Sequence, residues 1–159
     1  MRGRPLALVV AFSLATLATW TGWVYTHPPL VSFGMAERYD DQGQTLVYAI
    51  DLENRGGRPL TLTGVRVGGE KMDSPRAMAV ANFTDGLLAS SAAIWMEEHG
   101  HKLQTGPVRG WKILPDEARP GSYALVLDWQ GMHSPPGEII VYYRYLGLPM
   151  RYTFPWTLE

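Results

Sequence analysis

The 159-residue chain contains no cysteine. Disulfide bridges, zinc sites built on thiolates, cysteine nucleophiles and a lipid-modified cysteine anchor are therefore excluded. Basic residues are also few: apart from Arg2 and Arg4 at the N-terminus, twelve Lys and Arg stand against fifteen Asp and Glu. This balance provides no basic footprint for nucleic acid, so no nucleic-acid partner is expected.

The chain also lacks the short motifs of common enzyme classes. No serine lies in a G-x-S-x-G turn, and no glycine pair precedes a helix that could hold a phosphate. Adjacent carboxylates such as Asp40-Asp41 stand among turn residues, whereas general acid–base catalysis needs two carboxylates facing each other across a substrate. We therefore expect a protein that is not an enzyme and needs no cofactor. An enzyme whose residues are scattered over loops stays open as an alternative.

The long apolar run of the chain is at its N-terminus. Residues 5–25 carry no charge, and a helix of that length, at about 1.5 Å per residue, spans a hydrocarbon core of roughly 30 Å. Trp20, Trp23 and Tyr25 cluster at its far end, as aromatic side chains do at a membrane interface. Two arginines precede the run, so the positive-inside rule predicts a cytoplasmic N-terminus and an extracellular C-terminal domain.

Two alternatives to this membrane anchor are open. A signal peptide begins in the same way, and Thr16-Leu17-Ala18 resembles a cleavage site, in which case the protein is secreted. The apolar run continues past that site, however, and is longer than a typical signal peptide. A buried helix of a soluble protein would need a polar face, which the run lacks. The predicted organisation is an anchor over residues 1–26 and an extracytoplasmic domain over residues 27–159.

Most of residues 27–159 alternate between apolar and polar side chains, which is the period of a half-buried β-strand. Residues 46–53 alternate in this way before the turn residues 54–59, and alternation resumes at Leu60. The two runs predict a hairpin, with a β-bulge at Gly64 where the apolar phase shifts. Further strands are predicted over residues 31–35, 123–129, 139–145 and 152–158. Pro149 and Pro155 confine the last strand to a sheet edge.

The stretch between the predicted strands at residues 60–67 and 123–129 is less regular. Leu88, Ala92 and Trp95 have helical spacing, which predicts one short helix from about Gly86 to Glu98, or an irregular excursion. About seven short strands with turn signals between them predict an all-β fold, an antiparallel β-sandwich that follows one N-terminal transmembrane helix.

The segment from Tyr48 to Val67 resembles the second and third strands of bacterial extracytoplasmic immunoglobulin-like domains. In these domains an alternating strand ending in N-x-G precedes a Pro-Leu strand, as in Asn54 to Leu60 here. The approach to Tyr123 is similar to the tyrosine corner of such folds. Anchor, sandwich and a closing Tyr- and Pro-rich strand together resemble small membrane-anchored proteins of Gram-positive bacilli. The resemblance implies an immunoglobulin-like sandwich and carries no active-site residues.

A metal site is the first candidate for chemistry. His99 and His101 are two positions apart, so on a strand both imidazoles would share one face and could meet one ion. Met96, Met132 and Met150 could add the soft ligands that copper(I) prefers. The alternative is a solvated loop, since Gly100 separates the two histidines. A copper- or zinc-handling module is thus the second functional hypothesis.

A binding surface is the other candidate. Aromatic residues concentrate in the second half of the chain, and Tyr142, Arg144 and Trp111 are the types enriched at binding hot spots. Core packing is the alternative for these side chains. The favoured hypothesis is a membrane-anchored binding or scaffold module of the cell envelope. Its partner would be another envelope protein or a wall polymer.

Overall fold

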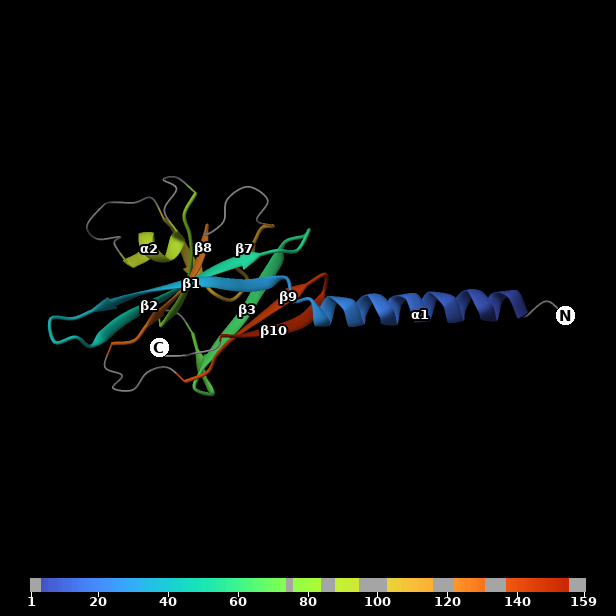
Figure 1. Ribbon diagram of the computed structural model, residues 1–159, viewed down its shortest axis with the longest axis horizontal. Coiled ribbons are helices and arrows are strands. Elements are labelled where there is room, and N and C mark those ends of the chain that lie inside the picture. Colours follow the sequence, from blue (N-terminus) through green and yellow to red (C-terminus); the bar gives the residue numbers. More distant parts are fainter. Residues whose placement is uncertain are drawn as a thin grey trace.

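A computed structural model of the chain describes residues 4–73, 76–83, 88–94, 103–115, 122–130 and 137–154. Helix α1 (Arg4–Thr26) projects from a domain made mostly of strands, to which α2 (Ala89–Ile94) is added (Figure 1). The strands of the described ranges are β1 (Leu30–Tyr39), β2 (Thr45–Asn54), β3 (Leu60–Val67), β4 (Glu70–Met72), β5 (Ala77–Ala81), β6 (Gln104–Pro107), β7 (Lys112–Ile113), β8 (Tyr123–Asp128), β9 (Ile139–Tyr145) and β10 (Leu148–Phe154).

The strands form two antiparallel sheets. One has the order β1-β2-β8-β5-β6, and the other has the order β10-β9-β3-β4, with β7 also pairing with β3. The prediction of a mostly β protein behind an apolar helix is therefore confirmed, but the predicted number of about seven strands is too low, since the described ranges contain ten. Strands β4, β6 and β7 have only two to four residues, too few to show an alternating pattern.

One hydrophobic cluster receives side chains from both sheets. In β8 and β9 every second residue is buried in it, which is what a period of two requires, whereas β1 contributes only Leu30. Complete burial of each such aliphatic side chain contributes roughly 1.5–3 kcal/mol. The members at the centre include Ile50 and Leu52 of β2, Leu125 and Leu127 of β8, Leu60 and Leu62 of β3, and Val141 and Tyr143 of β9.

Strand β2 is buried on both faces rather than on one. The predicted outward face includes Ala49 and Asp51, yet these residues are only 0% and 1% exposed. Helix α2 contacts β1, β2 and β8 and lies over this face. The helix falls within the predicted range of 86–98, and the remainder of that range lies outside the described residues.

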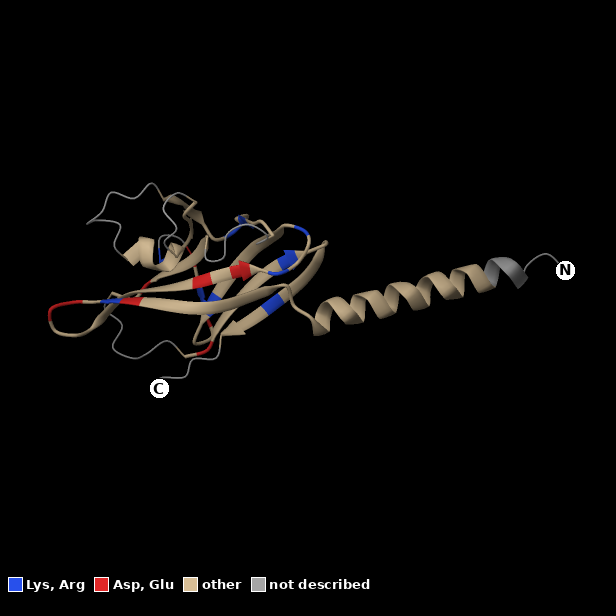
Figure 2. Cartoon of the chain, turned by 45° about the horizontal axis from the view of Figure 1, so that its top comes forward, with Lys and Arg blue, Asp and Glu red and all other residues tan. Residues whose placement is uncertain are grey.

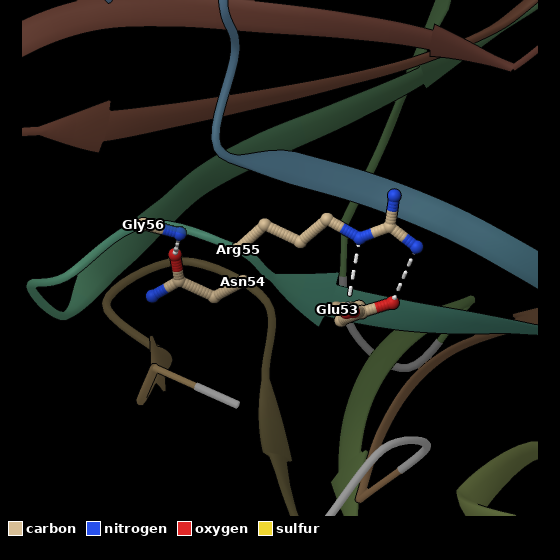
Figure 3. Close-up of polar contacts among 4 residues, drawn as sticks. All are labelled: Glu53, Asn54, Arg55 and Gly56. Atoms are coloured by element: carbon tan, nitrogen blue, oxygen red, sulfur yellow. Dashed lines mark hydrogen bonds and ion pairs between the residues drawn. The ribbon is translucent and has the colours of Figure 1, made fainter. Parts of the chain in front are cut away.

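The turn of residues 54–59 does not close a hairpin, so that prediction is wrong. Strand β2 pairs with β1 and β8, whereas β3 pairs with β9, β4 and β7, and the turn carries the chain from one sheet to the other. The Asn54 side chain organises it: its oxygen accepts a hydrogen bond from Gly56 N at 3.0 Å (Figure 3). Its amide nitrogen donates to the carbonyl oxygens of Arg58 and Ile113 at 2.9 and 3.0 Å.

Two local predictions are confirmed. The pairing of β3 with β9 shifts register between Leu62 and Gly64, as expected for a β-bulge at Gly64. Strand β10 is the edge strand of its sheet, where Pro149 costs no ladder hydrogen bond. Of the strand predicted over residues 152–158, the part up to Phe154 is described and belongs to β10.

Candidate functional site

Helix α1 is long and apolar enough to span a membrane, and its last turn packs on the domain. The spanning window covers Leu8–Thr26. Val24 is 2% exposed and belongs to the hydrophobic core, and the Tyr25 hydroxyl donates a hydrogen bond to Pro149 O at 3.2 Å. The rings of Trp23 and His27 stack with centroids 5.1 Å apart. The Tyr25 hydrogen bond joins the helix end to β10.

The outward face of the sheet next to α1 carries positive charge. Side chains of Lys112, Thr61 and Arg144 form one cross-strand row, since Thr61 pairs with both of the others. Neighbouring strands are about 4.8 Å apart, so such a row places two cations roughly 10 Å apart. A second row joins Lys71, Arg66 and Ile140, and Arg151 lies opposite Tyr142. We call this surface the basic face; its members are Arg66, Lys71, Lys112, Arg144 and Arg151.

Every cation of the basic face is exposed to solvent, and the outward positions of β3, β7, β9 and β10 include no acidic residue. Within the described residues, Lys71 alone among them forms an ion pair, with Asp73 at 2.7 Å. Arg66 and Lys71 lie at the end of the sheet marked by Ile140, whereas Lys112 and Arg144 lie near the β9–β10 turn that contacts α1. Figure 2 shows basic strand segments at this end of the domain, which α1 leaves. The acidic turn at the tip of the β1–β2 hairpin, which contains Asp40 and Asp41, lies at the opposite end.

The structure brings together two of the three residues predicted for a binding surface. Tyr142 and Arg144 both point outward from β9, Tyr142 half-buried and Arg144 exposed. Trp111 lies elsewhere: its half-buried ring packs against the hydrophobic core and approaches Gly106 so closely that a Cβ there would lie 2.7 Å from it. In this position the Trp111 ring packs β6 against the core.

A cleft of about 530 Å³ opens between the end of α1 and the edge of the same sheet. Tyr25 and Pro28 line it from the helix side, and β9 and β10 contribute Tyr142, Pro149, Met150 and Arg151. The cleft is thus mainly apolar, with two hydroxyl groups and one guanidinium group at its walls. The alternating pattern predicted Tyr142 as a binding-surface residue, but it did not predict Arg151. Arg151 lines the cleft because β10 pairs with β9, which places it opposite Tyr142.

Behind the outward residues of β9, the Tyr143 side chain is buried in the core. Burial raises its pKa to about 12, and the Leu30 backbone partly opposes this rise. The Tyr143 phenol is thus neutral at physiological pH and adds no charge to the site.

The predicted metal ligands His99 and His101 lie outside the described residues, as do Met96 and Met132. Met150 is buried, 7% exposed, on the inner face of β10. Among the described residues, no three His, Cys, Asp or Glu side chains gather in a group that could hold a metal ion. The metal-handling hypothesis stays a prediction.

Comparisons with known proteins add no family: no family model, curated protein or solved structure matches the chain.

Proposed function

We propose that this chain is a non-catalytic binding or scaffold module of the cell envelope, anchored by α1. The N-terminus would lie in the cytoplasm, and residues 27–159 would form an immunoglobulin-like β-sandwich outside the cell. The apolar window Leu8–Thr26 and the arginines before it support the anchor and its orientation.

The strand order supports the immunoglobulin-like assignment. The order β1-β2-β8-β5 corresponds to the A-B-E-D sheet of such domains, and β10-β9-β3-β4 corresponds to G-F-C-C′. The Tyr123 hydroxyl accepts a hydrogen bond from Leu114 N at 3.3 Å, nine residues upstream, as a tyrosine corner does. It differs in one respect, since Tyr123 begins β8, which takes the place of strand E rather than F.

The observation that carries the binding function is the basic face. Arg66, Lys112, Arg144 and Arg151 share one sheet surface and form no ion pair among the described residues, so they repel one another, and an anionic partner would relieve that repulsion. A wall polymer that carries repeated negative charges matches the cross-strand spacing of Lys112 and Arg144 better than a protein surface of mixed charge. Of the two partner classes predicted, the wall polymer is therefore favoured.

Co-sedimentation of the full-length protein in non-ionic detergent with purified cell walls tests this function. We expect binding that weakens as salt rises, because exposed charges are screened over about 10 Å at 0.1 M ionic strength. The double variant Arg66→Gln/Arg144→Gln should lose most of the binding. Arg38→Gln/Arg76→Gln removes the same charge from β1 and from the turn before β5, outside the basic face, and should bind as wild type does. Equal losses in the two variants, or no binding at all, would refute the proposal.

A further inference from the structure

We infer that the cleft between α1 and the β9–β10 edge binds the headgroup of an anionic phospholipid. This site rests on the proposed membrane anchoring, and it shares only Arg151 with the basic face. Its six lining residues, Tyr25, Pro28, Tyr142, Pro149, Met150 and Arg151, come from the helix end and from the two strands beside it.

The position of the cleft along α1 is the first argument. The window Leu8–Thr26 has 19 residues, and at about 1.5 Å per residue it is about 28 Å long, close to the hydrocarbon thickness of a bilayer. Tyr25 and Pro28 then lie in the headgroup layer. Trp20 and Trp23 are exposed, 41% and 59%, and belong to the aromatic belt that marks the interface.

The fixed attachment of the helix is the second argument. A flexible linker would let the domain move away from the bilayer. Here Val24 is buried in the core and Tyr25 donates its hydrogen bond to Pro149 O, so one wall of the cleft is an extension of the anchor itself. In this arrangement the cleft lies directly beside the end of the anchor.

The chemistry of the walls is the third argument. A phospholipid presents a phosphate above a glycerol and the first methylenes of its acyl chains. The Arg151 guanidinium can donate two parallel hydrogen bonds to a phosphate, and the Tyr142 hydroxyl is a further donor from the paired position on β9. Pro28 and Pro149 supply apolar surface for the glycerol and methylenes. A polar, charged wall polymer has no acyl chains to pack against these apolar walls, so a lipid is the favoured occupant.

The sign of the charge is the fourth argument. No acidic residue lines the cleft, and Arg144 adds a second cation two positions from Tyr142 on the same outward face. Each basic residue near an anionic bilayer contributes about 1 kcal/mol, which corresponds to roughly fivefold in affinity. A lipid with net negative charge is thus preferred over a zwitterionic one.

Native mass spectrometry of the full-length protein, released from detergent with added lipid, tests the site. The probes are phosphatidylglycerol and phosphatidylcholine with identical acyl chains. We expect one phosphatidylglycerol retained per protein in preference to phosphatidylcholine. Arg151→Gln should lower that retention about fivefold or more. Arg66→Gln removes a cation of the same face outside the cleft and should leave retention unchanged.

Each contrary result has a defined meaning. Equal retention of both lipids, or unchanged retention in Arg151→Gln, overturns the headgroup site. Equal loss in Arg66→Gln and Arg151→Gln indicates adsorption to the basic face as a whole and also overturns it. Competition by a soluble glycerol-phosphate polymer at the same phosphate concentration assigns the cleft to a wall polymer instead. If the wild-type protein does not sediment with cell walls but retains phosphatidylglycerol, the proposed function is overturned and this site is not. Thermal unfolding of each variant confirms that it is folded.

Discussion

The carboxylate of Asp51 accepts a hydrogen bond from Ser90 Oγ at 2.6 Å, although 39 positions separate the two residues. The Ser90 backbone N donates to the other oxygen of the same carboxylate at 3.0 Å. The two bonds fix the start of α2 on the outer face of β2, where Asp51 is buried. A carboxylate in this place is costly, since burial disfavours its charged form.

Replacing Asp51 with Asn should change how stability depends on pH. Burial raises the pKa of Asp51, and the hydrogen bonds from Ser90 partly oppose that rise. Because the folded state holds the proton more tightly than the unfolded chain, stability is favoured below the unfolded pKa of 3.8 and declines as pH rises through the raised pKa. The amide of Asp51→Asn can keep both contacts with Ser90 but does not titrate. Between the unfolded pKa and the raised folded pKa, the free energy of unfolding of the wild type should therefore fall relative to that of the variant. Above the raised pKa the difference between the two should stay constant.

Urea unfolding of the full-length protein in detergent, from about pH 3.5 to about pH 7, measures this difference. Asp41→Asn in the exposed β1–β2 turn is the control and should not reproduce it. A difference between wild type and Asp51→Asn that is independent of pH would show that the carboxyl does not titrate differently in the folded state.

The side chain of Asn54 provides a second test, because it is 0% exposed and bonds to three backbone groups. Asn54→Asp removes both donors and places a carboxylate oxygen against the carbonyls of Arg58 and Ile113. We expect a loss of about 2–4 kcal/mol in the free energy of unfolding, read from the shift of the urea midpoint. Arg55→Gln breaks only the exposed pair with Glu53 and should change the midpoint little. Similar midpoints for the two variants would contradict the role given to Asn54.

Alternation predicted β8 and β9 well because their core-facing residues have no exception, as in Leu125 and Leu127 of β8. It placed a strand at residues 31–35 correctly, but Phe33 and Met35 of that strand are exposed rather than buried in the core. It could not predict which strands pair. Residues 46–53 and 60–67 alternate in the same way whether they form a hairpin or belong to two sheets. The burial of Asp51 was also hidden, since a polar residue at an outward position indicates solvent unless a helix is known to cover it.

The candidate site was predictable only within one strand. Tyr142 and Arg144 share a face because they are two positions apart, and this follows from the sequence. Lys112 and Arg66 join them through pairing registers between segments far apart in the chain. The contact of Tyr25 with Pro149 spans 124 positions and has no sequence signal.

The turn between β9 and β10 predicts a stabilising substitution. Leu146 has φ 53° and Gly147 has φ 82°, and the flanking residues Tyr145 and Leu148 pair, so two residues form a type I′ turn. Positive φ costs an ordinary side chain about 1–2 kcal/mol, and Asn tolerates it better. Leu146→Asn should raise the free energy of unfolding by about 0.5–1 kcal/mol. Leu114→Asn is the control: Leu114 is similarly exposed but has no positive φ, so a gain there would contradict this explanation.

A pair of adjacent glycines offers the sharpest structural test. A Cβ on Gly56 would lie 2.6 Å from the Tyr145 hydroxyl oxygen and 2.8 Å from two ring carbons, closer than any real contact allows. A Cβ on Gly57 would meet nothing within 4 Å. Because Tyr145 is buried, its ring cannot move aside without disturbing the end of β9, so Gly56→Ala should lower the free energy of unfolding by about 1–3 kcal/mol. Gly57→Ala should leave it unchanged or slightly raised, since alanine restricts the unfolded chain. Thermal unfolding of both variants measures the contrast, and equal midpoints would mean that the turn does not pack on Tyr145.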